Sequence, residues 1–147
     1  KNQIDAAMQE DELSDIQLEL TKQGVRLTVP SSNIFDPGSA LIREEALPYL
    51  DKVARVLFRT RKRVYVEGHT DDTPIESAKF PSNWDLSAAR ASTIVRYFIV
   101  QHKFDPKRLV VIGLADQHPV VPNNNPVNKS KNRRIEFLIP GQGAPAL

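Results

Sequence analysis

The apolar and polar positions along this chain repeat with two different periods, one typical of helices and one typical of strands. Residues 4–23 carry apolar side chains at helical spacing, and Gly24 is well placed to end a helix, so this stretch predicts a first helix. Residues 25–29 alternate apolar with polar side chains, which predicts a half-buried strand. The Asp-Pro-Gly sequence at 36–38 indicates a turn.

The rest of the pattern predicts two more helices and three short strands. One apolar stripe predicts a helix from about Arg43 to Arg59, with Pro48 tolerated near its start. A second predicts a helix that begins near Ser82 or Asn83, and its expected buried face is Leu86, Ala89, Thr93, Ile94, Tyr97 and Phe98. Strands are expected at 64–67, 109–113 and 135–139, and an irregular loop at 119–128. This order of elements predicts an α/β sandwich with helices packed on a small sheet.

Composition narrows the class of protein. A chain of 147 residues, 40% hydrophobic and 26% charged, is typical of one globular domain with its own core. The formal net charge of +2 implies no strong field for binding polyanions. No apolar run approaches the roughly 20 residues that span a bilayer. Because the first residue is Lys1 rather than Met, we expect a trimmed or processed fragment, which leaves room for a membrane anchor upstream.

Acidic residues follow one of the predicted strands. Asp71 and Asp72 come soon after residues 64–67, at the edge of the sheet where open α/β folds tend to bind ligands. Arg90 lies four residues after the core-facing Leu86, so it lies at or near the buried stripe and needs a partner. Two interpretations stay open. Arg90 forms an ion pair with Asp71 or Asp72, or Arg90 and Asp71 bind the carboxylate and the ammonium of a ligand.

Other polar residues near these acids also have two interpretations. Asn83 either caps the helix or offers its amide to a ligand, and the helix start beside it favours a carboxylate. His69 is either a hydrogen-bonded structural histidine or a metal ligand together with Asp71 and Asp72. The chain has 3 histidines, and no two of them are closely spaced on one helix. A hydrolytic zinc site usually needs three protein ligands, so we expect no metal and no cofactor. With no cysteine and no Gly-x-Ser-x-Gly turn, the sequence gives no sign of nucleophilic catalysis.

Two basic clusters, residues 59–63 and 129–134, are the candidates for nucleic-acid binding. The nearly balanced charge favours solvated turns instead, so we expect no nucleic-acid partner. Arg133 and Arg134 are expected to point in opposite directions because a strand alternates its faces. One of them is expected to point toward Asp71 and the other to solvent.

Three blocks of sequence occur in a fixed order. They are Gly-His-Thr-Asp at 68–71, Asn-x-x-Leu-Ser-x-x-Arg-Ala at 83–91 and Asn-Arg-Arg-Ile-Glu at 132–136. Together they resemble the OmpA-like peptidoglycan-binding domain, over about residues 25–140. The long loop after Asp71, with Phe-Pro-Ser-Asn-Trp-Asp-Leu-Ser at 80–87, is similar to the MotB branch of that family, the peptidoglycan-anchoring stator subunits of the bacterial flagellar motor.

The resemblance implies a β-α-β-α-β-β sandwich over residues 25–140. A periplasmic linker helix would precede it at 1–24, and a disordered tail would follow at 141–147. The implied ligand is diaminopimelate or a similar diamino acid in the peptide stem of peptidoglycan. Asp71 matches the aspartate that grips its ammonium, and Arg90 matches the arginine that grips its carboxylate. The full implied site consists of Thr70, Asp71, Asn83, Leu86, Arg90 and Arg133.

The resemblance also implies partners and a location. The domain would be a homodimer in the bacterial periplasm, with the parent protein anchored in the inner membrane by a helix absent here. It would join an ion-channel partner subunit of the stator through that helix and perform no chemistry. The alternatives are a wall anchor of a lipoprotein or secretion system, and a metal-dependent cell-wall amidase that uses His69, Asp71 and Asp72.

Overall fold

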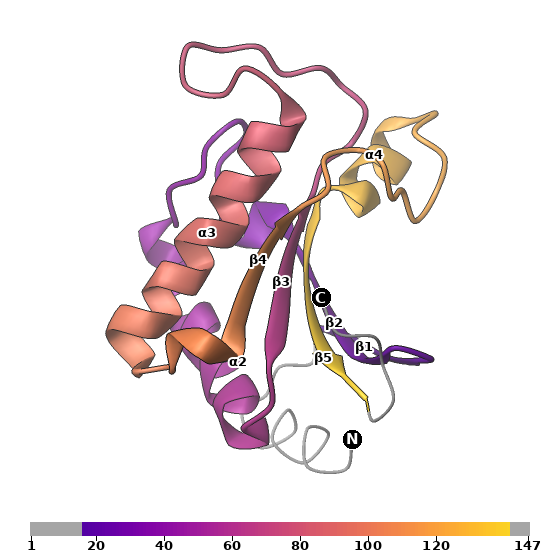
Figure 1. Cartoon of the computed structure of the whole chain (residues 1–147). Helices are drawn as coiled ribbons and strands as arrows, with labels where there is room; N and C mark the ends of the chain where they lie inside the picture. The colour runs from indigo at the N-terminus through magenta and orange to yellow at the C-terminus, as the bar shows by residue number, and fades with distance from the viewer. Residues whose placement is uncertain (1–15, 142–147) are drawn as a thin grey trace.

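A single mixed sheet organises the molecule. The computed structural model describes residues 16–141, and its five strands lie in the order β1-β2-β5-β3-β4 (Figure 1). The strands are β1 Gln17–Thr21, β2 Gly24–Pro30, β3 Val64–His69, β4 Leu109–Gly113 and β5 Arg134–Pro140. All neighbouring pairs are antiparallel except β3 and β4, which are parallel. That parallel pair requires a crossover, which contains α3.

The helices differ in length and place. The two long ones, α2 Leu47–Thr60 and α3 Asn83–His102, lie on one side of the sheet, and the short α4 Pro126–Asn132 lies beyond the start of β5 (Figure 1). Within residues 16–141 there are also three 3-10 turns: η1 Ser31–Asn33, η2 Glu44–Ala46 and η3 Pro106–Arg108. No helix in the described part of the chain is both long enough and apolar enough to cross a membrane.

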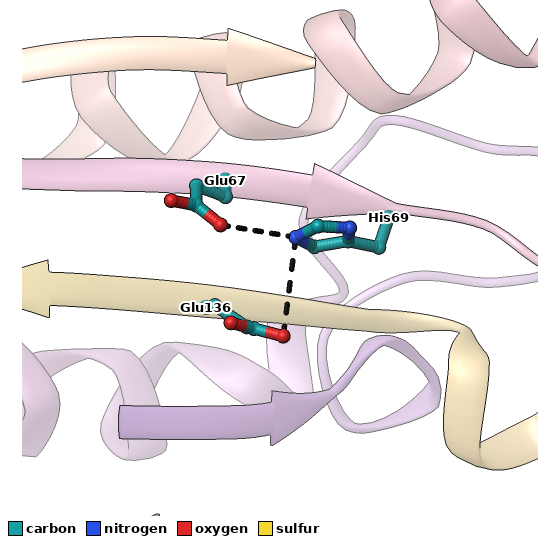
Figure 2. Close-up of side chains that lie close together, drawn as sticks. All are labelled: Glu67, His69 and Glu136. Carbon is teal, nitrogen blue, oxygen red and sulfur yellow. Dashed lines mark hydrogen bonds and ion pairs between the residues drawn. The ribbon is translucent and has the colours of Figure 1, made fainter. Parts of the chain in front are cut away.

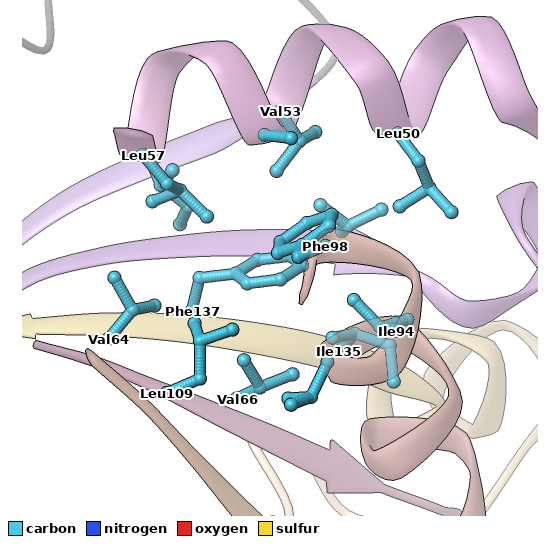
Figure 3. Close-up of a cluster of buried hydrophobic side chains, with 14 of the residues drawn as sticks. Leu50, Val53, Leu57, Val64, Val66, Ile94, Phe98, Leu109, Ile135 and Phe137 are labelled. Atoms are coloured by element: carbon cyan, nitrogen blue, oxygen red, sulfur yellow. The ribbon is translucent and has the colours of Figure 1, made fainter. Parts of the chain in front are cut away.

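The main hydrophobic core fills the space between α2, α3 and the sheet (Figure 3). At its centre the ring of Phe98 on α3 stacks on Phe104 and Phe137, with ring centroids 5.3 and 6.1 Å apart. The strands contribute every second residue, among them Leu27 and Val29 of β2. The intervening residues point to the opposite face of the sheet, as the period of two requires.

Most elements expected from the sequence are confirmed. The strands at 25–29, 64–67, 109–113 and 135–139 are β2, β3, β4 and β5, and the fold class is α/β as predicted. The helix expected from about Arg43 is η2 followed by α2, with Pro48 in the first turn of α2. The helix expected at 82 or 83 is α3, and its cap is Ser82, whose side chain accepts a hydrogen bond from the Asp85 N–H.

Three expectations were wrong. Residues 17–21 form β1, paired with β2, instead of the end of a helix, and residues 1–15 lie outside the described part. The loop expected at 119–128 runs into α4. On α3, Ala89, Thr93 and Tyr97 are only half-buried, whereas Ser87, Arg90, Ala91 and Val95 are buried. The buried face of α3 is therefore rotated relative to the predicted stripe and includes two polar residues, Ser87 and Arg90.

Two glycines let α3 approach the sheet closely. A Cβ atom added to Gly68 on β3 would lie 2.2 Å from the backbone oxygen of Ser87. A Cβ atom added to Gly113 on β4 would lie 2.6 Å from the backbone nitrogen of Ala88. The first turns of α3 therefore lie directly against the ends of β3 and β4, and this contact fixes where the polar residues of α3 lie.

Candidate functional site

A cavity of about 520 Å³ opens where β2 and β3 end and where β5 begins. It is lined by the loop after η1, the loop after β3, the first turns of α3 and the residue before β5. All six predicted site residues line it: Thr70, Asp71, Asn83, Leu86, Arg90 and Arg133. Four segments that are distant in the sequence thus meet around one space.

The carboxylate of Asp71 is buried and has a partner on each oxygen. Oδ1 accepts a hydrogen bond from the Thr73 N–H at 2.9 Å, which folds the loop back on itself. Oδ2 forms an ion pair with Nη1 of Arg133 at 2.5 Å. The N–H of Thr70 donates to the carbonyl of Ala115 at 2.9 Å, which ties this loop to the loop after β4. The backbone therefore fixes the position of the Asp71 carboxylate.

Arg90 is a buried cation that donates to backbone carbonyls only. Its Nε donates to the carbonyl of Ser39 at 2.8 Å and its Nη2 to the carbonyl of Asp36 at 3.1 Å, and its Cζ lies 5.0 Å from the ring centre of Phe35. Within residues 16–141 it forms no ion pair. Burial, and secondarily the charge of Arg133, lowers the pKa of Arg90 to about 10. The predicted ion pair of Arg90 with Asp71 or Asp72 is therefore wrong, because Arg133 and Lys129 take those places.

The loop after Asp71 is fastened from two sides. The side-chain amide of Asn83 donates to the carbonyl of Thr73 at 3.0 Å, so Asn83 lines the cavity and does not cap the helix. On the other side, Nζ of Lys129 on α4 lies 2.9 Å from Oγ1 of Thr73 and 3.3 Å from Oδ1 of Asp72. This role of α4 was not predicted, since α4 itself was expected to be loop.

The remaining wall of the cavity is mostly apolar. It includes Phe35, Pro37, Ile75 and Leu86, with Ser31 and Ser32 at the side of β2. A ligand that combines an ammonium, a carboxylate and a short hydrocarbon chain would find a partner for each part. No pattern in the sequence marked the wall residues that η1 and its following loop contribute.

His69 lies on the opposite face of the sheet from this cavity. Figure 2 shows Glu67 and His69 of β3 and Glu136 of β5 pointing toward one another. Nε2 of His69 lies 3.1 Å from Oε1 of Glu67 and 3.9 Å from Oε2 of Glu136. The predicted alternative of a metal site from His69, Asp71 and Asp72 is therefore wrong, because β3 sends His69 to one face and the following loop carries Asp71 to the other side.

The side chains of Glu67, His69 and Glu136 resemble a set of metal ligands, but arginines already balance the charges of the two glutamates. Their ligand atoms lie within 4.8 Å of one another. Glu136 forms ion pairs with both Arg26 and Arg134, and Arg26 also contacts Glu67 at 3.2 Å. Two glutamates and two arginines balance in charge, and a divalent cation would have to displace or adjoin both guanidinium groups. We therefore interpret this cluster as a structural network of ion pairs and hydrogen bonds that links β2, β3 and β5 on the face of the sheet opposite the core.

This network predicts a loss of stability in acid. Burial alone would raise the pKa of Glu136, but Arg134 and Arg26 hold it below its ordinary value. A carboxylate with a lowered pKa stabilises the fold above its unfolded pKa and loses that contribution as the pH falls through its folded pKa. We expect wild type to be more stable than Glu136→Gln at pH 7, and the gap to narrow below about pH 4.5. Urea unfolding of both proteins at several pH values measures the gap, and a constant gap would contradict the prediction.

The two arginines before and within β5 point in opposite directions, as predicted. Arg133 reaches the cavity, whereas Arg134 is buried on the opposite face, so the expectation that one of them points to solvent was wrong.

The two basic clusters lie at opposite ends of β3. One precedes Val64, and the other includes Arg134, which pairs with His69 in the sheet. They do not form one continuous basic surface.

Comparison with known proteins gives a consistent result. The model of the OmpA family matches residues 34–133. Motility protein B of Bacillus subtilis is 33% identical over 146 residues, covering 98% of this chain and 56% of that protein. The chain spans about half the length of curated relatives that it matches.

Solved structures agree with the sequence relatives. A putative MotB-like protein from Desulfovibrio vulgaris has a TM-score of 0.88 at 28% identity, covering 96% of this chain and 91% of that one. The cell wall anchor of the T6SS from Pseudomonas aeruginosa has a TM-score of 0.85 at 28% identity, covering 95% and 97%. The family match covers all six predicted residues and the rest of the cavity lining except Ser31 and Ser32, and the resemblance found in the sequence is confirmed: the chain belongs to the OmpA family.

Proposed function

We propose that this domain is a non-catalytic anchor that binds peptidoglycan by the diamino acid of its peptide stem. The observation that carries the proposal is that one cavity holds two opposite charges that are not paired with each other. Arg90 is a buried guanidinium with no carboxylate partner among the described residues, and Asp71 is a fixed carboxylate across the same space. A buried cation without an anion is costly, so the cavity favours a ligand that supplies one.

The chemistry of the site fits a zwitterion with an aliphatic chain. The ligand's carboxylate binds the guanidinium donors of Arg90 that the carbonyls of Asp36 and Ser39 leave free. Its ammonium binds Asp71, and its methylene groups contact the apolar wall near Leu86. Charge-assisted hydrogen bonds contribute about 1.5–3 kcal/mol each, so the two contacts suffice for reversible binding to a polymer that repeats the ligand.

The relatives suggest the setting in which the anchor works. Motility protein B is similar over nearly the whole chain, so we propose the periplasm as the location and a flagellar motor stator as the assembly. The parent protein would then be held in the inner membrane, form a homodimer and join the stator's channel subunit. The similarity to the T6SS cell wall anchor favours a second candidate, a wall anchor of a secretion system with the same ligand site.

Sedimentation with purified peptidoglycan sacculi tests the ligand site. We expect wild type to co-sediment, and Asp71→Asn and Arg90→Gln each to bind at least tenfold more weakly, the loss of one charge-assisted contact. Asp72→Asn is the matched control, because Asp72 follows Asp71 directly but pairs with Lys129 and does not line the cavity. Circular dichroism checks that all three variants fold.

Two outcomes would contradict the proposal. Wild-type binding by both folded variants would show that the two residues do not grip the wall. Release of soluble fragments from the sacculi by wild type would show that the domain is an enzyme. Unchanged sacculi and binding lost in Asp71→Asn and Arg90→Gln alone would support the anchor.

A further inference from the structure

The cavity is lined by one more positive charge than the proposed ligand end, with one ammonium and one carboxylate, would neutralise. The charged side chains that line it within residues 16–141 are Asp71, Arg90 and Arg133, with a net charge of +1. Lys129 and Asp72 nearby cancel each other. A ligand end with one ammonium and one carboxylate is neutral and would leave this excess charge in place.

Arg133 and Arg90 differ in their freedom to move. Arg90 is 5% exposed and is held by two carbonyls and the ring of Phe35. The side chain of Arg133 is 44% exposed, and its guanidinium contacts only Asp71 among the described residues. Arg133 can therefore turn into solvent without its own guanidinium becoming a buried unpaired charge, and Oδ2 of Asp71 then needs another cation as its partner.

The ion pair between Arg133 and Asp71 occupies the place that the ligand's ammonium needs. Oδ1 of Asp71 is held by the N–H of Thr73, and Oδ2 is the oxygen that Arg133 binds. An ammonium that binds Asp71 competes with Arg133 for that oxygen. Once displaced from Asp71, the Arg133 guanidinium would be an unpaired positive charge beside Arg90 and would repel Arg90. The same repulsion by Arg133 contributes to the lowered pKa of Arg90. A second anion at the mouth of the cavity would remove this penalty.

Resting on the proposed function, we propose that Arg133 is a specificity-determining residue that moves from Asp71 to a second carboxylate of the ligand. The site then selects stems that carry one ammonium and two carboxylates, and it discriminates against stems in which the second carboxylate is amidated. The second carboxylate balances the charge of the filled cavity, and the exposed position of Arg133 places it at the rim, where the rest of the stem leaves the site.

Calorimetric titration of the chain with a synthetic stem tests the proposal. The probe is N-acetyl-L-alanyl-γ-D-glutamyl-meso-diaminopimelate, which has one ammonium and three carboxylates. Three further probes each amidate one carboxylate: that beside the ammonium, the α-carboxylate of glutamate, or the C-terminal one. Amidation beside the ammonium removes the partner of Arg90 and tests the proposed function. The other two amides test Arg133 and distinguish the two sources of a second carboxylate.

We expect wild type to bind one of these last two amides about tenfold more weakly than the free acid. We expect Arg133→Gln to bind that amide and the free acid with equal affinity. Lys131→Gln is the matched control, since it removes an exposed charge of the same sign from α4 and should keep the wild-type discrimination. Equal binding of both amides and the free acid to wild type would overturn this inference alone, and so would a loss that persists in Arg133→Gln. No binding of the free acid to wild type would overturn the proposed function and this inference with it.

Discussion

Gly68→Ala is expected to lower the free energy of unfolding by about 3 kcal/mol or more, the upper end of what overpacking costs. The added Cβ would lie 2.2 Å from the carbonyl oxygen of Ser87 and 2.9 Å from its carbonyl carbon. Both are backbone atoms of α3, so no side chain can turn away to relieve the clash. The helix would have to move off β3, which also moves Arg90 relative to Asp71.

Urea unfolding measures the effect of this change, and Gly141→Ala is the matched control. A Cβ at Gly141 would meet its nearest atom at 3.5 Å, an ordinary van der Waals distance. We expect the control to unfold within about 1 kcal/mol of wild type, as substitutions away from close contacts do. If Gly68→Ala were as stable as Gly141→Ala, the close approach of α3 to β3 would be wrong.

Asn132→Ala is expected to destabilise the protein by about 3 kcal/mol, since it leaves several polar groups unpaired. The Asn132 side chain is completely buried. Its Oδ1 accepts from the N–H groups of Val120 and Val121 at 2.8 and 3.2 Å, and its Nδ2 donates to the carbonyl of Val121 and to Oδ1 of Asn123 at 2.9 and 2.8 Å. This single amide thus holds the loop that precedes α4.

The matched control for this second change is Asn124→Ala in the same loop. Asn124 is exposed and bonds only to the exposed amides of Asn125 and Asn128 among the described residues, so we expect a change within about 0.5 kcal/mol. Hydrogen exchange at Val120 and Val121 is a second readout, because their N–H groups lose protection in Asn132→Ala only. Unchanged exchange there would contradict the assigned role of Asn132.

The sequence was sufficient for the elements whose pattern is local and unambiguous. β2 alternates cleanly, and α3 has a serine cap and a long apolar stripe. The helix predicted over residues 17–21 was wrong because the local pattern is ambiguous. Leu18 and Leu20 have the spacing of a strand, whereas Ile16 and Leu20 have the spacing of a helix. The choice is made by pairing with β2, a contact that no local pattern contains. The seven-residue α4 was missed because it is too short for an apolar stripe, although Asn125 and Pro126 are typical of a helix start.

The candidate site was predictable as a set of residues but not as a set of contacts. The motif blocks name all six residues that meet at the cavity. The partners of Arg90 are backbone carbonyls of residues 36 and 39, which every residue type carries and no sequence pattern marks. The pairing of Asp71 with Arg133 depends on where the loop after β3 meets the start of β5, which only the folded chain determines.

The opposite directions of Arg133 and Arg134 have a consequence for how this family can tolerate insertions. Phe137, three residues beyond Arg134, lies in the core, so the register of β5 sets the core and the cavity together. One residue added between Asn132 and Arg134 would leave an arginine near the cavity but would detach the Asn132 amide from its loop or turn the apolar residues of β5 outward. A residue inserted at the exposed Asn124 is therefore expected to cost less stability than one inserted at the junction that follows α4.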